Sequence, residues 1–147
     1  MVQCHGLTQD LSSGNYMLVM NRLDISLRKY LQQNQTIWKE KVQITFHIIS
    51  ALEKIHHEGA IHRDLHSENV LYSQRYDEFH ISNLGFCGPA NKPSEQIYGN
   101  LPYIAPEILV GKEYTFKSDI YSVGILMWEI SSGQPLLLVL IMIMTLH

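Results

Sequence analysis

Apolar residues recur at intervals of three and four along two long stretches of this chain, as on one face of an α-helix. The first stretch is 37–57, with Thr36 as its expected N-cap and Gly59 just past its last turn. The second stretch is 117–132. The residues expected on the apolar faces are Trp38, Val42, Phe46, Ile49, Leu52 and Ile55 in the first, and Ile120, Val123, Leu126, Met127 and Ile130 in the second.

Short apolar runs separated by turn-forming residues predict two β-hairpins. The N-terminal pair comprises 2–7 and 16–20, joined by a polar segment containing Ser, Gly and Asn. The second pair comprises 70–72 and 79–81, and a short strand at 60–61 precedes it. Helices and hairpins together predict an α+β, mainly helical fold.

A short helix through Leu27 and Leu31 is expected to begin at Asp24, whose side chain can cap it. The pattern changes after Pro135, because residues 136–146 contain no charge and almost no polar group. That run is shorter than the roughly 20 apolar residues needed to cross a bilayer, so no membrane span is expected. A buried helix or strand is the first expectation for it, and an interfacial segment is the second.

The composition favours a folded protein in a reducing compartment. The chain of 147 residues is 46% hydrophobic and 17% charged, which argues against disorder. Its net charge of -3 gives no reason to expect nucleic acid as a partner. Cys4 and Cys87 form neither a disulfide framework nor a CxxC motif, and no basic segment with an apolar run opens the chain. We therefore expect a cytoplasmic protein.

One short loop carries the most specific chemistry. It reads His62-Arg63-Asp64, then four residues, then Asn69, with a short apolar strand behind it. Phosphoryl transfer needs a carboxylate to hold the attacking hydroxyl and an oxygen ligand to hold Mg²⁺ beside the nucleotide phosphates. An exposed turn with an ordinary Asp and Asn is the simpler alternative.

This loop resembles the catalytic loop of protein kinases, whose pattern is His-Arg-Asp, four residues, then Asn. The resemblance implies that Asp64 is the catalytic base and Asn69 a metal ligand. It gives His62 and Arg63 structural or regulatory roles. Three more segments match the family in order and spacing: 83–85 at the Asp-Phe-Gly position, 105–107 at Ala-Pro-Glu, and 118–124 at the start of the central helix of the large lobe.

Three residues in those segments have implied roles. In the family, the Asp of Asp-Phe-Gly carries a full charge to Mg²⁺, whereas Asn83 of this chain can offer one neutral oxygen to the metal. Asn83 is thus expected to be a weakened metal ligand, or else a simple turn residue. Glu107 has a structural role, and Asp119 supports the backbone of the catalytic loop. The helix dipole would favour Asp119 in any case.

The resemblance also implies a nucleotide pocket. It puts Met20 at the gatekeeper position, Asn21 and Leu23 on the hinge whose backbone meets adenine, and Leu71 on the lower wall. ATP and Mg²⁺ are the implied cofactors, and a protein substrate or binding partner is implied with them. Residues 87–101 correspond to the activation segment, where Ser94 and Tyr98 are candidate phosphosites or plain polar loop residues.

The chain is most similar to the tyrosine-kinase-like group of Ser/Thr kinases, but it contains no Gly-rich phosphate loop and no Val-Ala-Ile-Lys strand. We expect a partial kinase domain over 1–135 and an apolar tail unlike the family over 136–147. The predicted function is that of a protein kinase-like domain acting on Ser/Thr or Tyr, inactive in this form. A pseudokinase-like binding or scaffolding module is the alternative. A metal protein with His62 and His66 as ligands is a third reading, if a helix puts both on one face.

Overall fold

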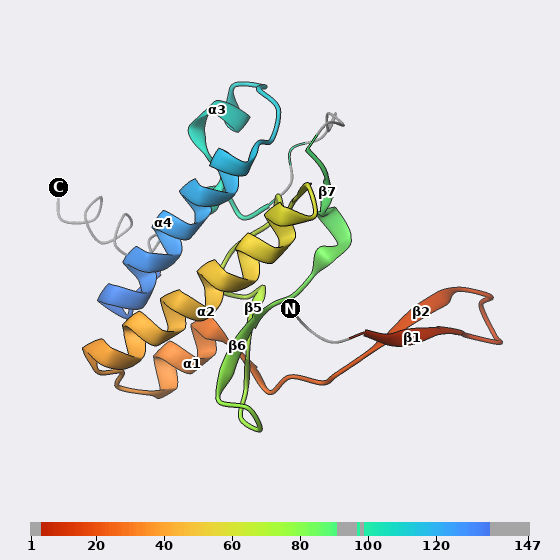
Figure 1. Ribbon diagram of the computed structural model, residues 1–147, viewed down its shortest axis with the longest axis horizontal. Coiled ribbons are helices and arrows are strands. Elements are labelled where there is room, and N and C mark those ends of the chain that lie inside the picture. Colours follow the sequence, from red (N-terminus) through yellow and green to blue (C-terminus); the bar gives the residue numbers. More distant parts are fainter. Residues whose placement is uncertain (1–3, 91–96, 98, 136–147) are drawn as a thin grey trace, which may run out of the picture.

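Helices and strands are mixed along the chain in the computed structural model, which describes residues 4–90, 97 and 99–135 (Figure 1). The strands are β1 Cys4–Gln9, β2 Tyr16–Met20, β3 Ile25–Ser26, β4 Ala60–Ile61, β5 Val70–Ser73, β6 Glu78–Ile81 and β7 Gly88–Pro89. The helices are α1 Leu27–Gln33, α2 Trp38–His57, α3 Pro106–Leu109 and α4 Phe116–Ser132, with 3₁₀ turns at Leu84–Phe86 and Leu101–Tyr103.

The two long helices, α2 and α4, lie side by side and antiparallel at the centre of the molecule (Figure 1). At one end, the ring Nε2 of His56 on α2 lies 2.8 Å from Oδ2 of Asp119 on α4. At the other end, the ammonium of Lys41 on α2 donates to the backbone carbonyl of Ser131 on α4, also at 2.8 Å. The main core collects around this pair and includes Leu27, Ile44, Ile48, Leu52, Ile55, Leu65, Val70, Ile81, Leu126 and Ile130.

The predicted apolar faces of both helices are only partly right. On α2, Leu52 and Ile55 are buried as expected, but the helix buries Ile44, Ile48 and Ala51 beside them. Apolar residues occupy more than one face of α2, so spacing alone does not decide which face meets the core. The predicted core residues that are exposed are Trp38, Val42, Phe46 and Ile49 on α2, and Ile120 and Met127 on α4.

Both predicted hairpins are confirmed, and two very short strands were missed. β1 pairs with β2, and β5 pairs with β6, in each case antiparallel. β3 adds to the free edge of β5, and β7 pairs with β4. The sequence did not predict β3, which directly precedes α1, or β7, which lies in a segment where Gly and Pro indicated a loop.

Two predicted helix caps are wrong. Helix α1 is capped by Ser26, whose Oγ accepts from the backbone N–H of Lys29, whereas Asp24 accepts from the backbone N–H of Gln74 at 2.7 Å. Helix α2 starts after Ile37 rather than after Thr36. The carboxylate of Glu40 accepts from the Ile37 N–H at 3.0 Å, which ties the first turn back to the cap position.

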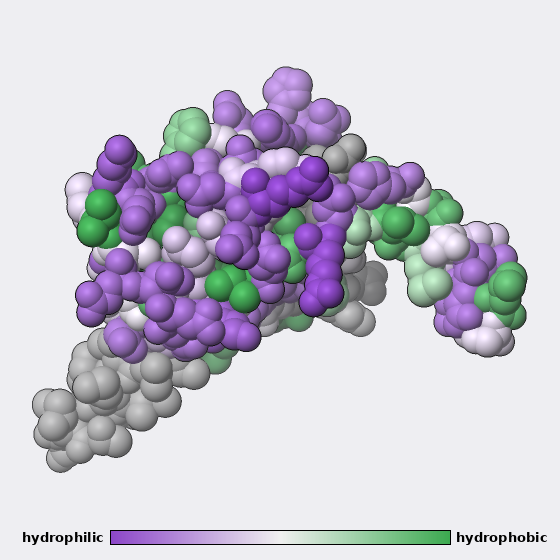
Figure 2. Space-filling view, turned by 90° about the horizontal axis from the view of Figure 1, so that it is seen from below, coloured by the Kyte–Doolittle hydropathy of each residue, from purple (hydrophilic) through white to green (hydrophobic). Residues whose placement is uncertain are grey.

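The hairpin of β1 and β2 projects from the rest of the molecule (Figure 1). Every residue of both strands is exposed, and hydrophobic side chains are visible on its surface in Figure 2. Gly59 has the left-handed backbone expected just past α2, with a φ of 70°. None of the described helices is both long enough and apolar enough to cross a bilayer.

Candidate active site

A buried carboxylate on α4 anchors the start of the predicted catalytic loop. Asp119 is 1% exposed, and its Oδ2 and Oδ1 accept from the backbone N–H groups of His62 at 2.8 Å and Arg63 at 3.0 Å. Arg63 has a φ of 70°, a left-handed conformation that costs free energy in any residue but glycine. The two hydrogen bonds from consecutive N–H groups fix this strained turn and so set the direction in which the loop continues.

Asp64, Asn69 and Asn83 meet at one place, although they come from two separate loops. The side-chain amide of Asn69 donates to the backbone carbonyl of Asp64 at 2.7 Å and to its Oδ2 at 2.8 Å. The amide of Asn83 donates to the same Oδ2 at 3.2 Å and to Oδ1 of Asn69 at 3.3 Å. Three residues that the sequence singled out from two separate motifs therefore form one hydrogen-bonded cluster.

The end of β6 delivers Asn83 to this cluster. Ser82 donates to the backbone carbonyl of Asn69 twice, from its N–H at 2.8 Å and from its Oγ at 2.9 Å. The ring Nε2 of His62 lies 3.0 Å from the Ser82 carbonyl oxygen. Asn83 then adopts a left-handed backbone with a φ of 58°, a conformation in which Asn is enriched. The turn aims its side chain back at the loop.

Asp64 is set up to be ionised. Its burial acts to raise the pKa, but hydrogen bonding and charge from His66, and the hydrogen bond from Asn69, outweigh burial and bring the pKa below its ordinary value. Nε2 of His66 lies 3.3 Å from Oδ1 of Asp64. Burial lowers the pKa of His62, against the opposing effect of its contact with Ser82. The site at neutral pH therefore holds a carboxylate beside a neutral, buried His62.

His66 was not predicted as a neighbour of the base. The sequence offered it as a metal ligand with His62, and the structure separates the two rings: one meets Ser82, the other Asp64. No group of three His, Cys, Asp or Glu side chains suited to a metal ion occurs among the described residues. His66 lies two positions after Asp64 and contacts it because the loop is tight, and the local sequence pattern does not predict that contact.

The donor set does not fit the Mg²⁺ that the kinase resemblance implies. Mg²⁺ sites rely on carboxylates, and Asp64 supplies the only one in this cluster. The side-chain amide of Asn83 donates to two acceptor oxygens, one of Asp64 and one of Asn69. An Asp at position 83 would place a second carboxylate against these oxygens, and a cation would be needed to offset the repulsion. The uncharged amide of Asn83 thus closes the cluster by donating to Asp64 and Asn69.

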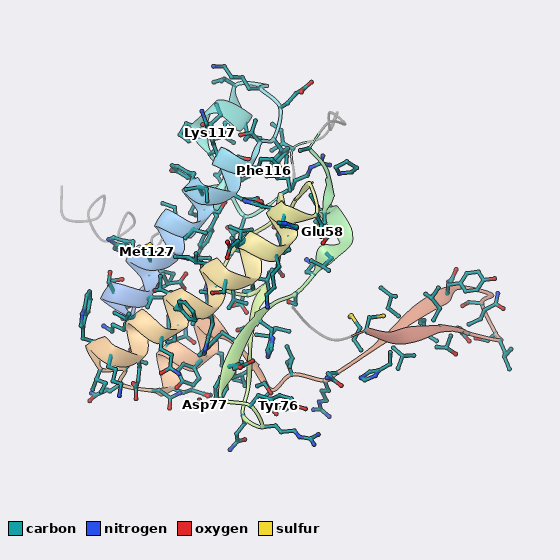
Figure 3. The ribbon with its side chains drawn as sticks, in the orientation of Figure 1. Glu58, Tyr76, Asp77, Phe116, Lys117 and Met127 are labelled. Carbon is teal, nitrogen blue, oxygen red and sulfur yellow. The ribbon has the colours of Figure 1, made fainter. Side chains whose placement is uncertain are left out.

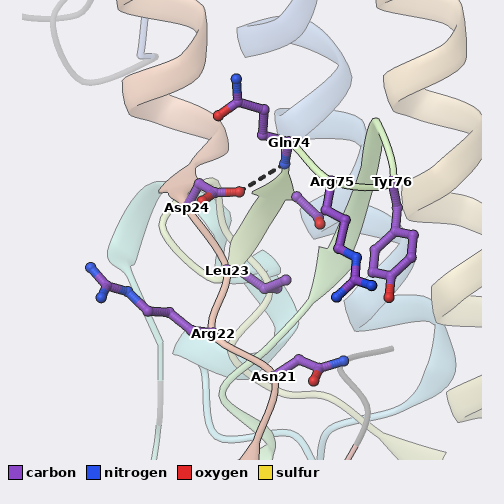
Figure 4. Close-up of a pocket in the computed structure, with 8 residues that line it drawn as sticks. Asn21, Arg22, Leu23, Asp24, Gln74, Arg75 and Tyr76 are labelled. Atoms are coloured by element: carbon purple, nitrogen blue, oxygen red, sulfur yellow. Dashed lines mark hydrogen bonds between the residues drawn. The ribbon is translucent and has the colours of Figure 1, made fainter.

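A second group of predicted residues lies away from this cluster. Asn21 and Leu23 line a cavity of about 540 Å³ together with Asp24 and the turn at 73–76 (Figure 4). Asp24 and Gln74 both line this cavity, and the hydrogen bond from the Gln74 N–H to the Asp24 carboxylate joins its two sides. Met20 is 51% exposed on the projecting hairpin, and Leu71 is half-buried on β5 opposite His80. Of the four predicted nucleotide-binding residues, Asn21 and Leu23 line this cavity, and Met20 and Leu71 are not among its lining residues.

The remaining predicted residues have simpler surroundings. The guanidinium of Arg63 donates to the carbonyl of Pro89 at 3.3 Å and lies 5.9 Å from the ring centre of Tyr114. A Cβ at Gly88 would come within 2.6 Å of that guanidinium, so a larger residue there would push the end of the Arg63 side chain aside. Glu107 lies in the first turn of α3. Ser94 and Tyr98 fall outside the described residues.

A buried polar network under the loop escaped prediction. Glu129 on α4 is 1% exposed, lies 3.3 Å from Nε of Arg28 and accepts from Oγ of Ser67 at 3.0 Å. The hydroxyl of Tyr103 also donates to Glu129. Burial and this bond raise the pKa of Tyr103 to about 12. The available signal was an acidic residue, Glu129, among the apolar residues of the second half of the helical stretch, which indicates a buried, paired carboxylate.

Comparison with known proteins agrees with this architecture. A family model described as the protein kinase domain matches residues 1–140. Relatives named dual serine/threonine and tyrosine protein kinase, from Macaca mulatta, Mus musculus and Homo sapiens, are 33% identical over 139 residues, or 91% of this chain.

The chain therefore belongs to the protein kinase domain family, whose members use ATP and Mg²⁺. It spans 15% of the length of these relatives.

Proposed function

We propose that this chain carries the hydroxyl-binding half of a protein kinase site, with Asp64 as the base. The supporting observation is the geometry of Asp64: Asn69 donates a hydrogen bond to its carboxylate, and Asp119 anchors the loop that carries it. The lowered pKa of Asp64 agrees with this role. Such a carboxylate accepts a hydrogen bond from a substrate hydroxyl and takes its proton as the oxygen attacks. The substrate class is protein Ser/Thr, with Tyr as a further acceptor, in keeping with the names of the relatives.

The same proposal assigns parts of the chain to the two lobes of a kinase domain. Residues 1–135 make up a partial kinase domain, in which the mainly helical body corresponds to the large lobe and the hairpin of β1 and β2 to a remnant of the small lobe. Residues 136–147 lie outside it. Asn21, Leu23, Met20 and Leu71 are the proposed contacts for the nucleotide. A cytoplasmic location suits the free cysteines Cys4 and Cys87.

This polypeptide alone should not transfer phosphate. Asn69 is the proposed metal ligand, but Asn83 replaces the charge that the metal needs with an amide already bonded to Asp64. The 147 residues also contain no Gly-rich loop and no strand Lys to hold the phosphates. Losing one such electrostatic contribution costs roughly 3–4 kcal/mol of barrier, and here several are lost together.

The hydrogen bonds donated by the uncharged Asn83 amide favour a second function, that of a pseudokinase-like binding module. Asn83 satisfies Asp64 and Asn69 without a cation, so the loop keeps its shape in the absence of nucleotide. A kinase fold with a self-contained loop can present its surface to a protein partner without catalysis.

The test compares phosphate transfer in two settings. The 147-residue chain is incubated with labelled ATP, Mg²⁺ and peptides containing Ser, Thr or Tyr, and no transfer above that of Asp64→Ala is expected. Transfer by the unmodified chain that Asp64→Ala abolishes would refute the proposed inactivity. A fusion that supplies the small lobe of a matched relative is then assayed with Asn83 and with Asn83→Asp.

In the fusion, Asn83→Asp should raise Mg²⁺-dependent transfer, and Asp64→Ala should remove it. Thermal melts of each form show whether it is folded. A folded fusion whose transfer survives Asp64→Ala would reject Asp64 as the base. Equal transfer by the fusion with and without Asn83→Asp would show that the amide is tolerated and that only the missing lobe limits the chain.

A further inference from the structure

Helix α2 has a second apolar face besides the one that packs into the core. It consists of Trp38, Val42, Phe46 and Ile49, which follow one another at intervals of four, four and three residues and are called the α2 stripe below. This spacing puts side chains in a row along one face of a helix. The residues that α2 buries, such as Ile48, lie on a different face. The core therefore leaves the α2 stripe in water.

All four side chains of the α2 stripe are exposed. Trp38 is 73% exposed, Val42 52%, Phe46 66% and Ile49 47%. Trp38 and Val42 also line a groove of about 440 Å³ together with Met127 of α4, which is labelled in Figure 3. Single exposed apolar residues are ordinary, whereas a contiguous row of them marks a surface for binding another molecule.

The charged residues at the two ends of the α2 stripe have opposite signs. Lys39 lies beside its first residue, and Glu53 lies one turn beyond its last. Both are exposed, and neither forms an ion pair with another residue in the described part of the chain. The carboxylate of Glu40, in the same turn as Lys39, already accepts from a backbone N–H. The stripe is thus basic at one end and acidic at the other.

These charges are placed symmetrically about Phe46. It lies seven residues after Lys39 and seven residues before Glu53, and seven residues are about two helical turns. A second α2 that runs in the opposite direction therefore presents an acidic end to the basic end and an apolar centre to the apolar centre. The α2 stripe is complementary to itself when reversed.

We propose that the α2 stripe is the interface of a homodimer, in which α2 of a second copy packs antiparallel to it. The two-fold axis passes at Phe46, so the two phenyl rings meet there. Val42 then faces Ile49 of the second copy, and Lys39 faces Glu53 of the second copy. At the crossing angle of about 20° that is usual in helix bundles, both ends stay within reach.

The charges select the direction of the pairing. In a parallel pair, Lys39 would face Lys39 and Glu53 would face Glu53, and like charges set against each other are unfavourable. The apolar side chains supply the driving force, since their contact removes them from water. A standard interface takes roughly 20–30 residues from each side. The α2 stripe is smaller, so the dimer should form reversibly and depend on concentration.

Sedimentation of the full chain over a range of concentrations tests the interface. The unmodified chain should pass from monomer to dimer as its concentration rises. Phe46→Asp should remain a monomer, because two carboxylates would meet at the axis. Val110→Asp is the matched control, since Val110 is an exposed valine that follows α3, and it should dimerise like the unmodified chain. An unmodified chain that stays monomeric, or association that Phe46→Asp leaves unchanged, would overturn the proposal.

Charge reversal tests the antiparallel direction. Lys39→Glu and Glu53→Lys should each weaken dimerisation by roughly tenfold, because both ends of the dimer then carry like charges. A mixture of the two variants restores opposite charges at both ends. Energy transfer between a donor-labelled and an acceptor-labelled variant should therefore show heterodimers about as tight as the unmodified dimer.

Lys54→Glu is the control for net charge, because Lys54 is exposed but lies about 100° around the helix from Glu53. It should dimerise like the unmodified chain, and thermal melts show that each variant is folded. A mixture that associates no more tightly than the single variants would reject the antiparallel pairing. Equal weakening by Lys54→Glu would show that net charge alone acts, which would also overturn the proposed contact of Lys39 with Glu53.

Discussion

The predicted catalytic loop and the N-terminal hairpin use polar and apolar residues in opposite ways. In the loop, polar side chains are buried: His62 and Ser67 are 0% exposed and Asn69 is 8% exposed. In the hairpin, apolar side chains are exposed, with Leu18 at 60% and Tyr16 at 73%. Burial of the polar side chains in the loop costs free energy unless they are hydrogen-bonded. The apolar side chains of the hairpin stay in water, although their burial would be favourable.

The difference lies in where each region finds its partners. The hairpin is held by contacts within itself, such as those of Asp10 with Ser12 and Ser13 in its turn. An isolated two-stranded hairpin is only marginally stable in water. The loop is held from a distance, because Asp119 and Glu129 reach it from α4. Unfolding of the whole molecule should thus depend on the loop anchors and hardly at all on the hairpin.

The largest expected effect is that of removing an anchor. Asp119→Ala leaves the buried N–H groups of His62 and Arg63 without their acceptor and removes the partner of His56. Breaking such a buried, paired group destabilises by roughly 3–5 kcal/mol. Urea unfolding followed by tryptophan fluorescence measures the loss. The hairpin counterpart, Asp10→Ala, removes hydrogen bonds from an exposed turn and should leave the urea midpoint unchanged.

The comparison fails if the two aspartates behave alike. A large shift for Asp10→Ala would show that the hairpin unfolds together with the core, and a negligible one for Asp119→Ala would show that α4 does not anchor the loop.

A smaller effect concerns alkaline pH. The pKa of Tyr103 is raised to about 12, against about 10 in an unfolded chain. Between these values the unfolded state has released the proton and the folded state has not, so the contribution of Tyr103 to stability is fully present below pH ~10 and is lost as pH rises toward ~12. Tyr103→Phe should cost roughly 1 kcal/mol at pH 7 and make that alkaline fall shallower.

Urea midpoints between pH ~7 and ~11.5 test this expectation. Part of the fall should remain, because burial and a bond to Asp77 also raise the pKa of Tyr72 to about 12. On the hairpin, Tyr16→Phe should leave the midpoint at neutral pH unchanged. An alkaline fall as steep in Tyr103→Phe as in the unmodified chain would be inconsistent with a proton held between Tyr103 and Glu129.

Local sequence patterns predicted the helices and hairpins of this fold better than they predicted which side chains are buried and which residues cap the helices. Periodicity found α2 and α4, and turn residues found both hairpins, because each of these depends on neighbours in sequence. Which face of α2 is buried depends on α4 and β6, so Trp38 and Phe46 were wrongly expected in the core. Ser26, and not Asp24, caps α1, because the carboxylate of Asp24 accepts a hydrogen bond from the Gln74 N–H just after β5.

In the candidate site, too, residues that belong to local motifs were predicted, and residues whose role depends on tertiary contacts were missed. Motifs in order along the chain were enough to select Asp64, Asn69, Asn83 and Asp119, which the structure brings together. His66 and Glu129 were missed as neighbours of the loop, since their contacts depend on a tight fold-back and on a helix packed from far along the chain. Of the predicted nucleotide-binding set, Asn21 and Leu23 line one cavity, and the roles of Met20 and Leu71 stay predictions.

The most direct measurement asks whether Asn83 takes the place of a cation at the loop. Melting temperatures are compared for the unmodified chain and Asn83→Asp, each with and without Mg²⁺. The unmodified chain should be insensitive to Mg²⁺, because its amide already bonds Asp64 and Asn69. Asn83→Asp should melt lower without metal, since two carboxylates then share one site, and should regain stability when Mg²⁺ is added. A rise in melting temperature with Mg²⁺ in the unmodified chain, equal to that of Asn83→Asp, would contradict the account.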